Sequence, residues 1–224
     1  MQFVDRRDAG RQLAERLLTI RLEEPLVLAL PRGGVPVAYE VAKALGAPLE
    51  VFVARKIGAP GHEELGIAAI AEGLDEPVAT PLIQQLGLTE RDLDELAARE
   101  QETLNRRVDR YRAGRSLPPL EGHDVVLVDD GLATGITAEA ALRALRQVRP
   151  RRLVLAVPAC GADTARRLRA AADDVICLFA PDAMFAVGMW YADFTQTTDR
   201  EVLDLLEDLR APTPAGARER RQRA

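Results

Sequence analysis

Short apolar runs alternate with amphipathic segments along most of this chain. Continuous apolar runs bounded by turn residues predict buried strands over residues 26–30, 49–54, 65–71, 124–128, 153–157 and 175–179. Apolar residues at helical spacing predict helices over residues 5–22, 35–45, 89–112, 137–148 and 162–172. The regular alternation after residue 124 predicts an α/β fold with a doubly wound, mostly parallel central sheet and flanking helices.

Composition sets the size of the domain and narrows its partners. A chain of 224 residues that is 47% hydrophobic can bury one core, so we expect a single domain over residues 1–210. The Pro-, Gly- and Arg-rich segment 211–224 is expected to be disordered. A net charge of −5 argues against a nucleic-acid partner. No apolar run approaches the roughly 20 residues of a membrane span, and the N-terminus has no apolar signal core, so we expect a cytoplasmic protein.

The most informative segment is VVLVDDGLATGITAEAAL, residues 125–142. Two acids, Asp129 and Asp130, follow a buried strand, and a loop rich in Gly, Ala and Thr leads into a helix. Backbone N–H groups at a helix N-terminus favour a phosphate, while paired acids suit sugar hydroxyls or a metal. The alternative is an ordinary strand–turn–helix connection, but a helix cap needs only one acid. No GxxxxGK[ST] motif occurs, and no GxGxxG motif follows a strand.

This segment resembles the 5-phosphoribosyl 1-pyrophosphate (PRPP) signature of the type I phosphoribosyltransferases. The resemblance implies a central sheet with a small hood and lid region, here about residues 55–115 and 181–195. It implies that Asp129 and Asp130 act in catalysis and bind the ribose hydroxyls, directly or through Mg²⁺. It also implies a cradle for the 5′-phosphate made by Ala133, Thr134, Gly135, Ile136 and Thr137.

Two further segments resemble the family's pyrophosphate-contacting loops. LALPRGGVPVA, residues 28–38, is similar to the pyrophosphate loop, with Arg32, Gly33 and Gly34 as contacts and a non-proline cis peptide near Arg32–Gly33. ARKIGAPGHEELGIAAIAEG, residues 54–73, is similar to the flexible lid, with Arg55 and Lys56 as catalytic cations and residues 58–61 as a flexible link. The alternatives are a plain strand-to-helix turn and two surface cations beside a mobile loop.

PDAMFAVGMWYADF, residues 181–194, resembles the hood of the 6-oxopurine branch. By position, Phe185 stacks on a base, Val187 lies beside it and Asp193 holds magnesium. Trp190 and Tyr191 could supply the stacking surface instead, and an aromatic core cluster is the alternative. VPACG, residues 157–161, lacks the base-reading lysine of that branch, and Ala133 replaces its aspartate. The acceptor base is therefore not assignable.

The resemblance implies transfer of the 5-phosphoribosyl group from PRPP to a nitrogen nucleophile, a nucleobase in purine or pyrimidine salvage, with release of pyrophosphate. The expected cofactor is Mg²⁺, and a homodimer is the common assembly of such folds. One alternative is a non-catalytic PRPP- or nucleotide-binding regulator. Another is a Rossmann-like or response-regulator domain, against which the second acid and the Thr-Gly-Ile-Thr loop count. Gly135→Val is expected to block phosphate binding at little loss of fold stability.

Overall fold

The computed structural model of the protein describes residues 2–210, so the predicted disorder of residues 211–224 lies outside the described residues. A five-stranded sheet in the order β2-β1-β6-β7-β8 forms its centre, and every neighbouring pair is parallel. Its strands are β1 (Pro25–Ala29), β2 (Leu49–Val51), β6 (Asp124–Val128), β7 (Arg152–Ala159) and β8 (Asp174–Phe179). The predicted α/β class with a parallel central sheet is confirmed.

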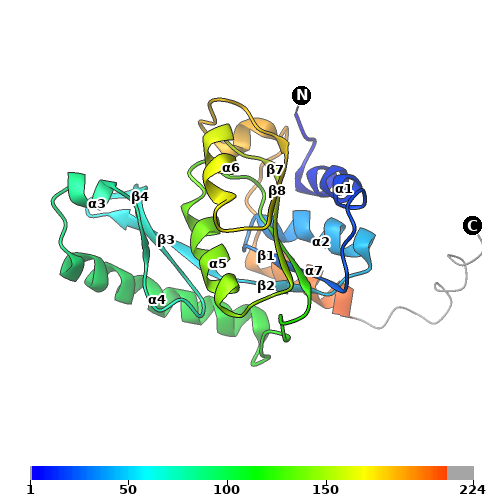
Figure 1. Cartoon of the computed structure of the whole chain (residues 1–224), viewed down its shortest axis with the longest axis horizontal. Helices are drawn as coiled ribbons and strands as arrows, with labels where there is room; N and C mark the ends of the chain where they lie inside the picture. The colour runs from blue at the N-terminus through cyan, green and yellow to red at the C-terminus, as the bar shows by residue number, and fades with distance from the viewer. Residues whose placement is uncertain (1, 211–224) are drawn as a thin grey trace, which may run out of the picture.

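Helices cover both faces of this sheet (Figure 1). One face carries α1 (Arg6–Leu17), α2 (Gly34–Leu45) and α7 (Asp199–Arg210), and the other carries α5 (Ile136–Gln147) and α6 (Ala162–Leu168). Successive strand residues point to opposite faces. In β6, Val126 and Val128 pack in the α1–α2–α7 layer, whereas Val125 and Leu127 pack under α5 and α6. Burial on both faces explains why the strands are continuous apolar runs.

An antiparallel unit extends from one side of the sheet (Figure 1). It consists of β3 (Ala54–Ala59), β4 (His62–Ala71), β5 (Val78–Ala79), the short α3 (Leu82–Gln85) and the long α4 (Glu90–Arg112). Leu104 and Tyr111 of α4 are buried in the same cluster as Ile57 and Ile67 of the hairpin. Helix α4 therefore braces the hairpin against the main body.

The structure corrects several predicted elements. The strand predicted over residues 49–54 is split, because the chain leaves the main sheet after Val51 and enters the second sheet at Ala54. Residues 58–61 are not a flexible link but the end of a β-hairpin, in which Gly61 adopts φ 75° at the turn. The helix predicted over 162–172 ends at Leu168, and β5, α3, α7 and the 3-10 helix η1 (Val187–Trp190) were not predicted.

The strand order reverses between β1 and β6, because β1 leads on to β2 on one side and pairs with β6 on the other. The crevice beyond the carboxyl ends of two such strands is where ligands bind in open α/β sheets. The β1–α2 loop and the β6–α5 loop both emerge there. These two loops are the segments that the sequence predicted to bind pyrophosphate and phosphate.

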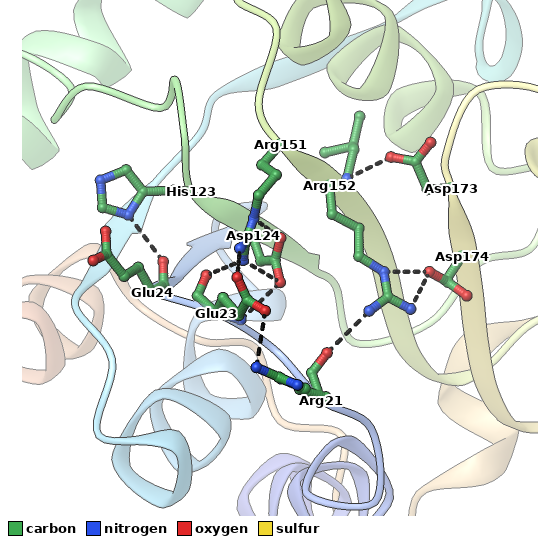
Figure 2. A network of polar contacts seen from close by, with 10 residues as sticks. Arg21, Glu23, Glu24, His123, Asp124, Arg151, Arg152, Asp173 and Asp174 are labelled. Carbon is green, nitrogen blue, oxygen red and sulfur yellow. Dashed lines mark hydrogen bonds and ion pairs between the residues drawn. The ribbon is translucent and has the colours of Figure 1, made fainter.

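A polar network connects the strands at the opposite end of the sheet, where the strands begin (Figure 2). The carboxylate of Asp124, at the start of β6, is buried and lies 2.9 Å from Nη2 of Arg151. It also accepts a hydrogen bond from the backbone N–H of Glu23 over 2.8 Å. Arg152 at the start of β7 pairs with Asp174 at the start of β8.

None of the helices formed by residues 2–210 is long and apolar enough to cross a membrane.

Candidate active site

A cavity of about 370 Å³ opens at the carboxyl ends of β1 and β6. Its wall includes seven of the residues that the sequence predicted as site residues, namely Arg32, Gly33, Arg55, Lys56, Asp129, Asp130 and Thr137. Leu30, Pro31, Ala54 and Arg107 complete the lining. The pyrophosphate loop, the lid hairpin and the signature loop therefore meet around one space.

The two signature acids, Asp129 and Asp130, both line this cavity. Oδ1 of Asp129 accepts the backbone N–H of Asp130 over 2.8 Å, and Oδ2 of Asp130 lies 2.8 Å from Nε of Arg6. Burial raises the pKa of Asp129 well above its usual range, and the neighbouring charge of Asp130 adds to this. Burial also raises the pKa of Asp130, while Arg6 acts in the opposite direction. A bound cation or hydroxyl donors would therefore stabilise the ionised form of both carboxylates.

The signature loop is fastened from behind by hydrogen bonds to its carbonyl groups. The carbonyl of Ala133 accepts a hydrogen bond from the hydroxyl of Thr164 over 2.8 Å, and the carbonyl of Thr134 accepts one from Arg167. The carbonyl of Gly135 accepts the N–H of Glu139 over 2.9 Å. The N–H groups in the first turn of α5, which begins at Ile136, lack intrahelical acceptors as in every helix. The loop therefore offers donors to an anion.

The β1–α2 loop packs directly on the signature acids. A Cβ atom at Gly33 would lie 2.0 Å from Oδ2 of Asp130, and one at Gly34 would lie 2.8 Å from the carbonyl oxygen of Val128. Both glycines are therefore required by the close approach of two loops. The amide of Gly34 donates to the carbonyl of Leu30 over 3.1 Å, within the turn itself. The non-proline cis peptide lies at Pro31–Arg32, one bond before the predicted position.

Four cationic side chains line the cavity: Arg32 from the β1–α2 loop, Arg55 and Lys56 from β3, and Arg107 from α4. Nε of Arg55 lies 2.5 Å from Glu100, and Nζ of Lys56 lies 3.0 Å from Glu64. Burial lowers the pKa of Arg107, and the like charges of Arg55 and Arg32 lower it further. Like charges crowded in a half-buried position are stabilised by a multiply charged anion.

Arg107 was missed at the level of sequence, although α4 carries a signal for it. Leu104, Arg107 and Tyr111 follow one another at helical spacing, and Leu104 and Tyr111 are fully buried. A charged residue on a buried stripe needs a partner or a ligand. Glu100 belongs to the same stripe and finds its partner in Arg55.

The hood residues stand apart from the cavity wall. Phe185 is 84% exposed, and Val187 packs on the signature loop, where its Cγ1 would lie 2.6 Å from a Cβ at Gly131. The carboxylate of Asp193 accepts hydrogen bonds from the amide and hydroxyl of Thr195 over 2.9 Å and 2.6 Å. Within residues 2–210, no three His, Cys, Asp or Glu side chains gather as a metal site. The structure therefore does not bring Asp193 together with the acid pair.

The fold and the site define a class: a doubly wound α/β protein with a phosphate-type loop and an acid pair at the switch point of its sheet. The family described as "Phosphoribosyl transferase domain" matches residues 5–192. The chain belongs to this family.

Similar proteins come from several bacteria. A protein of Thermus thermophilus, known from its crystal structure, is 46% identical, superposes with a TM-score of 0.78, and is matched over 93% of this chain and 99% of its own. A protein of Aquifex aeolicus shares the fold at 15% identity, with a TM-score of 0.52, over 90% of this chain and 84% of its own.

Proteins from two strains of Mycobacterium tuberculosis, provisionally named as phosphoribosyl transferases, are 45% identical over 205 residues. The match takes in 92% of this chain but only 46% of each relative. The chain thus spans about half the length of these curated relatives.

Proposed function

We propose that this chain is a phosphoribosyltransferase that moves the 5-phosphoribosyl group of PRPP to a nitrogen nucleophile and releases pyrophosphate. One observation carries the proposal. A single cavity is lined by an acid pair, by Thr137 in the first turn of α5 and by four cations. PRPP is a sugar with a phosphate at one end and a pyrophosphate at the other, and these groups together suit its sugar and its anionic ends.

In the proposed complex, the loop residues Ala133, Thr134, Gly135, Ile136 and Thr137 hold the 5′-phosphate by their N–H and hydroxyl groups. Asp129 and Asp130 accept hydrogen bonds from the ribose hydroxyls, directly or through Mg²⁺. Arg32 and the amide of Gly33 hold the pyrophosphate, and Gly34 lets the β1–α2 loop lie close to the end of β6. Arg55, Lys56 and Arg107 add charge from the hairpin and α4.

Chemistry at the anomeric carbon explains why this set is sufficient. Loss of pyrophosphate develops positive charge on the ribose ring, as in glycoside cleavage, and negative charge on the leaving group. The acid pair stabilises the positive charge on the ribose, and the four cations stabilise the negative charge on the leaving group. Both interactions are stronger in the transition state than in the ground state, so they accelerate the reaction. Alignment of the nucleophile with C1 supplies much of the remaining rate.

The acid pair also fits a magnesium ion. Mg²⁺ binds few protein carboxylates and takes most of its ligands from phosphate, hydroxyl and water oxygens. When bound, it would neutralise pyrophosphate oxygens and make the leaving group more stable. Asp129 and Asp130 would hold it, whereas the carboxylate of Asp193 accepts hydrogen bonds from Thr195 and is given no part in this complex.

The acceptor is proposed to be a nucleobase, which suits a role in purine or pyrimidine salvage. Phe185 would supply a stacking face and Val187 would lie beside the ring, because both belong to the segment that borders the signature loop at Gly131. The identity of the base is left to experiment, since Ala133 and the segment 157–161 lack the groups that read a 6-oxopurine.

A pyrophosphate-release assay over purine and pyrimidine bases tests the proposal. We expect release with PRPP, Mg²⁺ and one base, and none when the base is left out. If PRPP binds but no base in the panel gives pyrophosphate release, transfer to a nucleobase is contradicted.

A PRPP-binding regulatory protein is the second candidate. It is favoured by the ion pairs of Arg55 with Glu100 and of Lys56 with Glu64, which occupy two of the proposed catalytic cations. Binding without turnover would select it.

A further inference from the structure

Arg6 reaches the signature acids from a part of the chain that the sequence did not connect with the cavity. It is the first residue of α1, and its Nε donates to Oδ2 of Asp130 over 2.8 Å. The two side chains are 11% and 14% exposed. A buried guanidinium or carboxylate without a partner is costly, because its charge has lost contact with water. The pairing therefore holds both side chains in one geometry.

The same guanidinium is fastened to the hood segment. Its Nη1 donates to the carbonyl oxygen of Thr195 over 2.7 Å, and its Cζ lies 3.9 Å from the centre of the Phe194 ring. Tyr191 makes a second connection, because its hydroxyl donates to the backbone carbonyl of Asp130 over 2.5 Å. The side chain and the main chain of Asp130 are thus both tied to the segment around residues 191–195.

The space around this pair leaves little room for another arrangement. A Cβ atom at Gly33 would lie 2.0 Å from Oδ2 of Asp130 and 3.3 Å from Nε of Arg6. The carboxylate of Asp130 therefore lies against Arg6 and the β1–α2 loop, while the hood segment contacts Arg6 and the main chain of Asp130. Loss of Arg6 would remove the donor that keeps this carboxylate in its present rotamer.

We propose that Arg6 is a positioning residue: it fixes the carboxylate of Asp130 against the β1–α2 loop and ties it to the hood segment, and ligand binding at the acid pair depends on it. The inference rests on the proposed function, since the ligand is PRPP. Arg6 acts through Asp130 and does not contact PRPP itself. A lysine supplies the charge but not two donors in a fixed fork, so it replaces Arg6 only in part.

A double-mutant cycle of Arg6→Gln and Asp130→Ala tests this, with PRPP affinity measured by calorimetry and the thermal midpoint measured without ligand. We expect each single change to lower PRPP affinity about tenfold or more. The double variant should bind no more weakly than Asp130→Ala alone, because Arg6 has lost the group through which it acts. Arg6→Lys should lie between wild type and Arg6→Gln. Arg7→Gln is the matched control, because Arg7 follows Arg6 on α1 but pairs with Glu40.

Losses in PRPP affinity that multiply in the double variant would overturn the inference, as would wild-type affinity in Arg6→Gln. If Arg6→Gln does not fold, Arg6→Lys carries the same cycle. Absence of PRPP binding in the wild type would overturn the proposed function instead. The ligand-free cycle then decides on Arg6, because thermal midpoints that add without coupling contradict a positioning contact, and coupled midpoints support it.

Discussion

Gly135 occupies the position where the signature loop turns into α5. Its φ is 68°, a left-handed value that favours glycine, and an added Cβ would lie 2.6 Å from Cγ2 of Thr164 on α6. The expectation that Gly135→Val would spare fold stability is therefore wrong, because the side chain would collide with α6 rather than only fill the phosphate loop.

A comparison with Gly46 isolates that collision. Gly46 has a similar φ of 64°, but an added Cβ there meets nothing within 4 Å. We expect Gly46→Ala to lower the free energy of unfolding by about 1 kcal/mol through backbone strain alone. Gly135→Ala should lower it by about 2–4 kcal/mol, since the overpacking is added. Urea denaturation of both variants gives the two values, and equal losses would contradict the packing role.

Asp129 carries an energetic conflict that a substitution can reveal. Burial and the charge of Asp130 raise the pKa of Asp129 in the folded protein. As pH rises, Asp129 therefore ionises at a lower pH in the unfolded chain than in the folded protein. The free energy of unfolding therefore falls as pH rises from the ordinary carboxyl range toward the raised pKa. Asp129→Asn should accordingly be more stable than wild type at pH 7 without ligand, and this advantage should shrink near about pH 4.

Thermal midpoints measured across this pH range check the prediction for Asp129→Asn. Each kcal/mol of relieved destabilisation should raise the midpoint by about 2–4 °C. Asp94→Asn, at an exposed acid on α4, serves as the control and should change little. A less stable Asp129→Asn at neutral pH would show that the carboxylate has a structural partner instead.

At the scale of elements, α4 brings Arg107 to the cavity. We expect Arg107→Gln to weaken PRPP binding about tenfold, because a charge-assisted contact with the pyrophosphate is lost. Stability should hold or rise, since burial and the like charges of Arg32 and Arg55 oppose Arg107 in the ligand-free protein. Arg106→Gln, at an exposed arginine beside it, is the matched control for calorimetry and thermal unfolding. A less stable Arg107→Gln with normal affinity would contradict this assignment.

Elements with strong local patterns could be predicted from the sequence. The five strands of the central sheet were all anticipated, because burial on both faces leaves continuous apolar runs. Helix α7 could also have been found, since Val202, Leu205 and Leu206 mark one buried face at helical spacing. The hairpin of β3 and β4 was harder to predict, because Gly58, Pro60 and Gly61 suggest a loop as readily as a turn.

The site shows the same division between local and long-range information. Asp129, Asp130 and the loop up to Thr137 lie in one continuous segment, so the sequence displays them together. Arg6 lies 124 residues before Asp130, and no local pattern links the two. Contacts of this kind depend on how α1 and the hood segment pack, which only the fold determines.

For the whole molecule, the two ends of the parallel strands differ in function. The cavity lies at their C-terminal ends, and the network around Asp124 lies at their N-terminal ends (Figure 2). We expect Asp124→Ala to lower the free energy of unfolding by about 1–3 kcal/mol, because the guanidinium of Arg151 and the amide of Glu23 lose their hydrogen bonds to a buried carboxylate. PRPP affinity should be unchanged in the folded fraction.

Chemical denaturation and calorimetry on the same sample check this separation. Asp204→Ala is the comparison, since its ion pair with Arg200 is exposed and should contribute less than about 1 kcal/mol. A large loss of PRPP affinity in Asp124→Ala would show that the two ends are coupled.

Calorimetric titration of PRPP with Mg²⁺ into the wild type and into the Asp129→Asn, Asp130→Asn double variant tests the central claim most directly. The site described here predicts a dissociation constant in the micromolar range for the wild type and no measurable binding for the double variant. Equal binding by both proteins, or none by the wild type, would contradict the assignment of this cavity to PRPP.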